Sequence, residues 1–319
     1  MNRYAYAFQS WFKPLVLLIA VGLLPAVSLL PAVSLLPAVS LLPLDNTFFV
    51  PALLLFSPLM LMPSWSGMSR LQYKLEYAAA VAMAGSFQLV PGIGATLLAL
   101  PWLVARLYVV KDVAMECRRT GLPSAATACV YAAAVFPAIG AAWIVAHRAN
   151  WAPWGFDPLI VLLTAAHFHH AGFTLPLMAG LNAKANPGCW TRFSCVAILL
   201  GVPLVAVGIT GTHFGVLKFV EPFGVAILVL GALGVAVSQV WRGLERQRSI
   251  LARIGFLISG ASLFAAMVLA LGFGLRYVIP NFALTMPQMW AIHGTLNAFG
   301  FGLCGILAWR GAVTRSERP

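Results

Sequence analysis

Residues 157–181 read DPLIVLLTAAHFHHAGFTLPLMAGL, an apolar stretch with His167, His169 and His170 at its centre. It is long enough to cross a membrane, because a span needs roughly 20 mostly apolar residues. A bilayer core offers no water to hydrogen-bond an imidazole, so these side chains must find partners inside the protein, bind a metal or haem, or carry protons. The stretch therefore predicts a membrane-spanning helix and the centre of a functional site.

The composition of the whole chain agrees with a membrane protein. Of its 319 residues, 61% are hydrophobic and 9% are charged, whereas soluble domains usually carry about 25% charged residues. The net charge of +12 is spread between apolar segments instead of forming one basic patch, which argues against nucleic-acid binding. We therefore expect the lipid bilayer to be the main partner.

The chain divides into ten apolar segments of about the length of a span. They begin near Pro14, Thr47, Tyr77, Gly92, Pro123, Phe156, Arg192, Val216, Ile250 and Pro287. One division is open, because Tyr77 to Val110 could be one long kinked helix instead of two spans.

The basic residues favour two spans there. With ten spans and a cytoplasmic N-terminus, all but three of the 20 Lys and Arg residues are cytoplasmic, the exceptions being Arg148, Lys218 and Arg276. Nine spans would move four more to the outside: Arg3, Lys13, Arg70 and Lys74. We therefore predict an all-α transmembrane bundle of about ten spans, with both termini cytoplasmic and residues 1–319 forming one integral membrane domain.

Residues 23–43 contain the hexapeptide LLPAVS in three identical copies, followed by the start of a fourth. Structural repeats use longer periods and tolerate sequence drift, so the copies indicate a recent tandem duplication. Their prolines predict a kinked segment within or beside the first span.

The cysteines give no sign of a disulfide framework or a cysteine zinc site, because no Cys-x-x-Cys pair occurs. They are Cys117, Cys129, Cys189, Cys195 and Cys304. HExxH and GxSxG motifs are also absent from the sequence, so protease and esterase activities have no support. An enzymatic function is left open and would require a bound cofactor.

A second polar motif, HGTLN at residues 293–297, lies in the last apolar segment. Helical rise places His167 near the middle of the membrane and His293 in its outer half, where Glu221 also lies. The polar residues expected to share an outer-half cavity are His167, His170, His213, Glu221, His293 and Asn297, with Arg276 and Asn281 at its rim.

Helix geometry separates the three clustered histidines. His167 and His170 share one side of the helix, whereas His169 points about 200° away from His167 and needs a different neighbour. On the last span, His293 and Asn297 are one turn apart, and Gly294, Gly300 and Gly302 would let another helix approach closely.

Three interpretations of these residues stay open. The cluster could be structural, fixing the bundle through hydrogen bonds between helices. It could support proton- or ion-linked transport, with the imidazoles relaying charge to Glu221, unless that carboxylate pairs with Lys218 instead. It could also bind a single transition metal or haem through His167, His169 and His293.

Three stretches resemble the YndJ-like family of bacterial polytopic membrane proteins. They are LLTAAHFHHAGFTLPL at 162–177, GVPLVAVGIT at 201–210 and MWAIHGTLNAFGF at 289–301. The family motif reads HFHYAGF, so His170 here replaces a tyrosine, whereas His167, His169, His293 and Asn297 match. The resemblance implies a multi-pass protein of the bacterial inner membrane and implies no particular chemistry.

Overall fold

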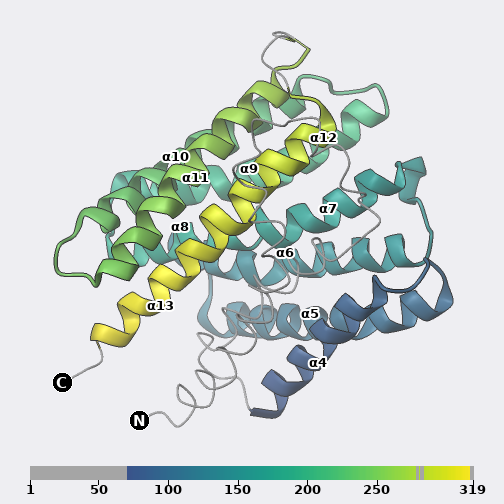
Figure 1. Ribbon diagram of the computed structural model, residues 1–319, viewed down its shortest axis with the longest axis horizontal. Helices are drawn as coiled ribbons and strands as arrows, with labels where there is room; N and C mark the ends of the chain where they lie inside the picture. Colours follow the sequence, from purple (N-terminus) through teal and green to yellow (C-terminus); the bar gives the residue numbers. More distant parts are fainter. Residues whose placement is uncertain (1–69, 278–279, 281–283, 317–319) are drawn as a thin grey trace, which may run out of the picture. The chain divides into compact units, whose positions relative to one another are not determined.

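A computed structural model describes residues 70–277, 280 and 284–316, and every regular element in these ranges is a helix (Figure 1). The predicted segments at Pro14 and Thr47 and the hexapeptide repeat lie outside the described residues. The helices are α4 (Arg70–Ser86), α5 (Ile93–Thr120), α6 (Ala125–Arg148), α7 (Pro158–His170), α8 (Thr174–Ala185), α9 (Cys189–His213), α10 (Val220–Leu244), α11 (Ile250–Gly274), α12 (Met286–Gln288) and α13 (Cys304–Ser316). A 3-10 turn at Pro153–Gly155 precedes α7, and two π-helical segments join α12 to α13.

Seven helical segments in these described ranges are long and apolar enough to cross a membrane. They are α5, α6, α7 with α8, α9, α10, α11, and the segment Met286–Gly311. Each begins close to a predicted start, so the multi-pass helical fold is confirmed. The helix α4 is separate and shorter, at 17 residues.

The division near Gly92 is confirmed, because the chain turns between α4 and α5 instead of continuing as one helix. Gly92 has a φ of 157°, and its N–H donates to the carbonyl of Arg148 at 2.7 Å. The Arg148 guanidinium in turn donates to the carbonyl of Leu89 at 2.7 Å. The end of α6 thus supplies partners for a backbone turn that the Pro91-Gly92 pair forces out of helical geometry.

Three helices begin at residues whose side chains cap them. Ser124, Asp157 and Ser249 accept hydrogen bonds from backbone N–H groups of α6, α7 and α11, respectively. Asp157 is followed by Pro158, which is favoured in the first turn because that position needs no backbone donor. Capping therefore fixes where α7, the helix with the three histidines, begins.

Glycines allow the close packing of α9 against α10. A Cβ added to Gly201 would lie 2.7 Å from the Cα of Leu228, and one added to Gly208 would lie 2.4 Å from the Cα of Glu221. These distances leave no room for a side chain, so the two backbones lie in direct contact, as small residues permit in membrane helices. The helix α10 packs against α11 on its other side, and α6 contacts α5, α7, α8 and α9.

Candidate functional site

The helix with the three histidines is interrupted directly after them. The helix α7 ends at His170 and α8 begins at Thr174, so the predicted span at 157–181 consists of two helices. At the break, the N–H of Gly172 donates to the carbonyl of His167 at 3.0 Å, and the Thr174 hydroxyl donates to the carbonyl of His170 at 2.6 Å. Local partners therefore satisfy the backbone where α geometry stops, as a break inside a membrane requires.

The second polar motif lies in a helix that also departs from α geometry. Met289–His293 and Leu296–Leu303 are π-helical, and they contain His293 and Asn297, respectively. Such turns are rare overall, and those that occur are frequently found at functional sites. Both histidine motifs thus coincide with irregular helix geometry.

The structure brings His167 and His293 together. Their ring centroids are 6.4 Å apart and the ring planes are inclined by 23°. The Nδ1–H of His293 donates to the carbonyl of Ala266 on α11 at 2.9 Å, and its Nε2 accepts from the Asn297 amide nitrogen at 3.1 Å. These two bonds assign the proton of a neutral His293 to Nδ1. His167 is exposed, whereas His293 and Asn297 are half-buried.

The structure gives His169 a separate environment, as its direction on the helix predicts. It is fully buried, its Nε2 accepts from the indole N–H of Trp102 at 3.0 Å, and its Nδ1 bonds to the carbonyl of Ala165 at 2.8 Å. The ring also lies against Gly140, where an added Cβ would be 2.4 Å from Nδ1. His169 therefore holds α7 against α5 and α6.

A series of polar contacts continues from His169 and Trp102 to α4. The guanidinium of Arg106 lies 4.3 Å from the centre of the Trp102 ring and forms a buried ion pair with Glu76. Burial of both charges makes each dependent on the other, because an unpaired charge in this environment would be costly. Sequence reasoning missed this network. The signal for it was Trp102, an aromatic with a polar N–H placed inside a span instead of at its end.

The predicted metal ligands do not meet as a set of three. His167 and His293 face each other, whereas both nitrogens of His169 are already bonded to Trp102 and Ala165. Across residues 70–277, 280 and 284–316, no group of three or more His, Cys, Asp or Glu side chains is arranged to hold a metal ion. His170 is half-buried, and its two ring nitrogens have no hydrogen-bond partner among the described residues.

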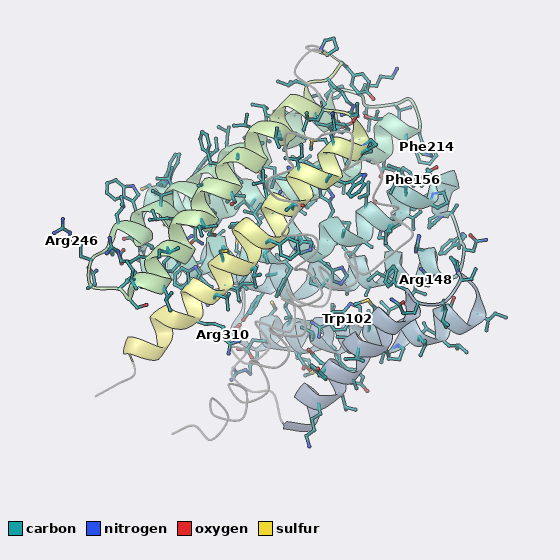
Figure 2. The ribbon with its side chains drawn as sticks, in the orientation of Figure 1. Trp102, Arg148, Phe156, Phe214, Arg246 and Arg310 are labelled. Carbon is teal, nitrogen blue, oxygen red and sulfur yellow. The ribbon has the colours of Figure 1, made fainter. Side chains whose placement is uncertain are left out.

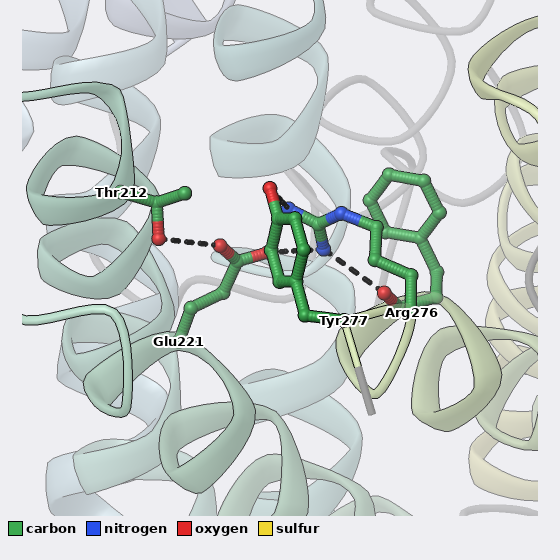
Figure 3. Close-up of polar contacts among 5 residues, drawn as sticks. Thr212, Glu221, Arg276 and Tyr277 are labelled. Carbon is green, nitrogen blue, oxygen red and sulfur yellow. Dashed lines mark hydrogen bonds and ion pairs between the residues drawn. The ribbon is translucent and has the colours of Figure 1, made fainter. Parts of the chain in front are cut away.

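Glu221 belongs to a different cluster from the one expected (Figure 3). It is 3% exposed, and its two carboxylate oxygens accept from the Thr212 hydroxyl at 2.8 Å and from the Arg276 guanidinium at 2.5 Å. The predicted alternative of pairing with Lys218 is therefore wrong, because the more distant Arg276 takes that place. Partial burial alone would lower the pKa of Arg276, but the hydrogen bond and charge of Glu221 outweigh it and raise that pKa.

One other predicted cavity residue, His213, also lies elsewhere. His213 is exposed, its Nε2 bonds to the carbonyl of Trp154 at 3.1 Å, and its ring stacks on Phe156 with centroids 4.1 Å apart. Asn281 lies outside the described residues. The arrangement at the middle of the helices therefore centres on His167, His293 and Asn297.

Comparison with known proteins places the chain among membrane proteins. The sequence model of the family described as YndJ-like protein matches residues 40–301. A protein of Bacillus subtilis (strain 168), named "Uncharacterized membrane protein YndJ", is 31% identical over 182 residues, which is 55% of this chain. The match covers 31% of the length of that relative. No solved structure matches the chain.

Proposed function

The chain belongs to the YndJ-like family, and for this membrane protein we propose proton-linked transport in which His167 and His293 relay protons through the middle of the membrane. One observation carries the proposal: two imidazoles from different spans face each other, His167 in the last turn of α7 before the α7–α8 break and His293 in a π-helical segment. Histidine is the side chain whose ordinary pKa lies closest to neutrality. Broken helices at the middle of the membrane are a recurrent feature of transporter binding sites.

Asn297 supplies a means of linking proton uptake to movement. Its amide nitrogen donates to Nε2 of His293 and also to the backbone carbonyl of the same residue at 2.9 Å. A proton can bind to Nε2 only after this amide rotates or withdraws, because two donors cannot face each other. Proton transfer from His167 would therefore require a local change in the π-helical segment.

A purely structural role predicts different behaviour. Hydrogen bonds between membrane helices contribute about 0.6 kcal/mol on average, so loss of one would loosen the bundle slightly and leave no transport signature. The bonds of His169 fit such a role. The His167 and His293 rings stack at 6.4 Å and are not hydrogen-bonded to each other by any contact in the described residues, so their opposition adds little stability.

The test is proton flux into liposomes that contain the purified protein, a trapped pH-sensitive dye and a potassium diffusion potential. A bacterial small-molecule extract is present on both faces, so that a carrier that needs a co-substrate is also active. We expect wild-type protein to acidify the lumen faster than empty liposomes, and His167→Gln and His293→Gln each to reduce that flux by about tenfold or more.

His213→Gln is the matched control, since it removes an imidazole from an exposed position away from the pair. It should retain the wild-type flux. Equal flux in wild type, His167→Gln and His293→Gln would refute the proposal, as would wild-type flux no greater than that of empty liposomes.

Metal or haem binding is the competing proposal, and it now rests on His167 and His293, because both nitrogens of His169 are bonded to Trp102 and Ala165. Metal analysis and an optical spectrum of the same preparations distinguish the two. A stoichiometric metal or a haem absorption band that is lost in both variants would make cofactor chemistry the leading function instead of proton relay.

For the topology we propose ten spans, both termini cytoplasmic, one integral membrane domain over residues 1–319 and a location in the bacterial inner membrane. The support is the distribution of basic residues, which concentrate over residues 106–119, 184–192 and 242–253. Cysteine accessibility in whole cells tests it: reagents that do not cross membranes should label a cysteine placed at Lys218 and should not label one placed at Arg246.

A further inference from the structure

A cavity of about 680 Å³ lies where the end of α8, the start of α9 and the end of α10 meet, and neither His167 nor His293 lines it. Polar and charged side chains line it, among them Asn182, Thr191, Arg242, Glu245 and Arg248. This cavity plays no part in the proposed proton relay, so its occupant is a separate question.

The start of α9 forms one wall of the cavity. Gly188 precedes the helix and has no side chain to cap it, and the first residues of α9, from Cys189 to Thr191, line the cavity. The leading N–H groups of a helix have no partner within the helix, and the helix dipole places partial positive charge there. An uncapped N-terminus of a 25-residue helix therefore favours an anion.

Asn182 supplies an independent sign of a ligand. It lines the cavity, is 2% exposed, and its Oδ1 accepts from Nε of Arg242 at 2.8 Å. That bond fixes the amide with its Nδ2 donor on the other side, and Nδ2 is buried with no partner among the described residues. A buried donor without an acceptor is costly, so the site calls for a ligand with acceptor oxygens.

The charges at the cavity leave one cation without a carboxylate. Glu245 pairs with Arg248 at 2.6 Å, which neutralises both. Arg242 is 7% exposed, and its guanidinium is held 4.3 Å from the centre of the Trp309 ring as well as by Asn182. A fixed, buried guanidinium beside a helix N-terminus is suited to a phosphate group.

We propose that this cavity binds a phosphate group, carried either by an anionic phospholipid or by a free anion. Trp190 and Trp241 line the same cavity and are 54% and 66% exposed. Exposed tryptophans at span ends lie at the level of lipid headgroups, where a phospholipid could present its phosphate to the cavity from the side.

Cys189 allows a test on the wild-type chain. It is exposed and lines the cavity, whereas Cys117 on α5 does not line it and serves as the internal reference. The protein is placed in nanodiscs of phosphatidylcholine or of phosphatidylglycerol, and the rate of maleimide labelling of each cysteine is followed by mass spectrometry of peptides. Inorganic phosphate is added to the phosphatidylcholine sample and compared with chloride at equal ionic strength.

We expect occupancy of the cavity to slow labelling of Cys189 by about fivefold at about four times the Kd, with Cys117 unaffected. Protection by phosphatidylglycerol alone would identify a lipid headgroup, and protection by phosphate as well would identify the phosphate group itself. No protection of Cys189 by either would overturn the proposal.

Two variants give the residue-level test. Asn182→Asp keeps an acceptor for Nε of Arg242 but replaces the unpartnered donor with an anion, so it should abolish protection while the protein stays folded. Arg242→Gln should do the same. Arg246→Gln is the control, because Figure 2 shows Arg246 pointing away from the helices at the α10–α11 connection, and the residue does not line the cavity. Full protection in a folded Asn182→Asp variant would also overturn the proposal.

Discussion

Gly140→Ala is the change whose effect the structure predicts most directly. The new Cβ would lie 2.4 Å from Nδ1 and 2.6 Å from Cε1 of His169, and 3.0 Å from the carbonyl oxygen of Ala165. Ordinary contacts of such atoms are about 3.5 Å, so the imidazole must move by about 1 Å. It is fully buried and bonded at both nitrogens, so this movement breaks bonds that are 3.0 and 2.8 Å long.

The expected loss follows from three terms. Overpacking costs about 2 kcal/mol, and two hydrogen bonds between or within membrane helices contribute about 0.6 kcal/mol each. Replacing glycine by alanine inside a helix stabilises the folded state by about 1 kcal/mol, which offsets part of this loss. We therefore expect Gly140→Ala to lower the free energy of unfolding by about 2 kcal/mol. The assay is equilibrium unfolding of the purified protein in mixed micelles, with increasing fractions of denaturing detergent.

Gly294→Ala is the matched control, because a Cβ there would meet no atom within 4 Å. It should be neutral or stabilising by up to about 1 kcal/mol. The decisive comparison is the double variant with His169→Ala, in which removal of the imidazole takes away the two atoms nearest to the new Cβ. If Gly140→Ala costs the same with and without His169, the proposed clash is not the cause and the argument fails.

Three further outcomes are expected. Trp102→Phe removes the indole donor from a buried imidazole and should cost about 0.6 to 1.7 kcal/mol in the same unfolding assay; no change would show that the bond contributes nothing. The pKa of Arg276 is raised in the folded protein, so its contribution to stability is complete below the unfolded-state pKa and is lost only as pH rises through the higher folded-state value. The wild type should therefore show no loss of stability from the Glu221–Arg276 pair up to about pH 11. Arg276→Lys should keep the attraction to Glu221 up to about pH 10.4, the ordinary lysine pKa, and lose it as pH rises further through the folded-state value that pairing raises, so unfolding measured from about pH 9 upward checks both. Asn297→Asp replaces the donor to His293 with an acceptor that holds a proton on the ring, so proton flux into liposomes should fall by about tenfold, and unchanged flux would remove Asn297 from the relay.

The sequence predicts the helices well where apolar length and punctuation residues decide. Pro91 and Gly92 mark the break between α4 and α5, and the capping residue Asp157 marks the start of α7. The break at His170 was not predicted, although Gly172 and Pro176 follow it and Pro176 has no N–H to donate to the carbonyl of Gly172. The apolar length outweighed these signals in the prediction, and the bonds of Gly172 and Thr174 that satisfy the break are visible only in the folded chain.

In the candidate site, the sequence predicts the direction in which a side chain points from its helix but not the residue that it contacts. The 3.6-residue period correctly separates His169 from His167, because it depends on one helix alone. The partner Trp102 could not be predicted, since it lies 67 residues away and depends on how α5 packs on α7. The ion-pair partner of Glu221 was also missed. Lys218 was the expected partner because it is close in sequence, whereas in the folded chain the partner is Arg276.

Close packing by glycine was also only partly predictable. A Cβ on Gly300 would lie 2.1 Å from the Ser262 hydroxyl of α11, so this glycine does admit a neighbouring helix. Gly294, in the same span, meets nothing within 4 Å, so the expectation was wrong there. Spacing along a regular helix cannot rank such positions when the segment is π-helical, because the added residue in each turn rotates later side chains.

The structural and functional interpretations of the histidine cluster fit together once the two faces of α7 are considered. His169 fixes one face of the helix to Trp102 on α5 and against Gly140 on α6. Residues two positions apart point about 200° away from each other, so this anchor turns His167 toward the last span, where it meets His293. The stability gained at His169 thus supports a neighbouring imidazole that contributes little stability itself. A site that must change protonation gains from this separation, because its own bonds can be rearranged while the anchored face holds the helix in place.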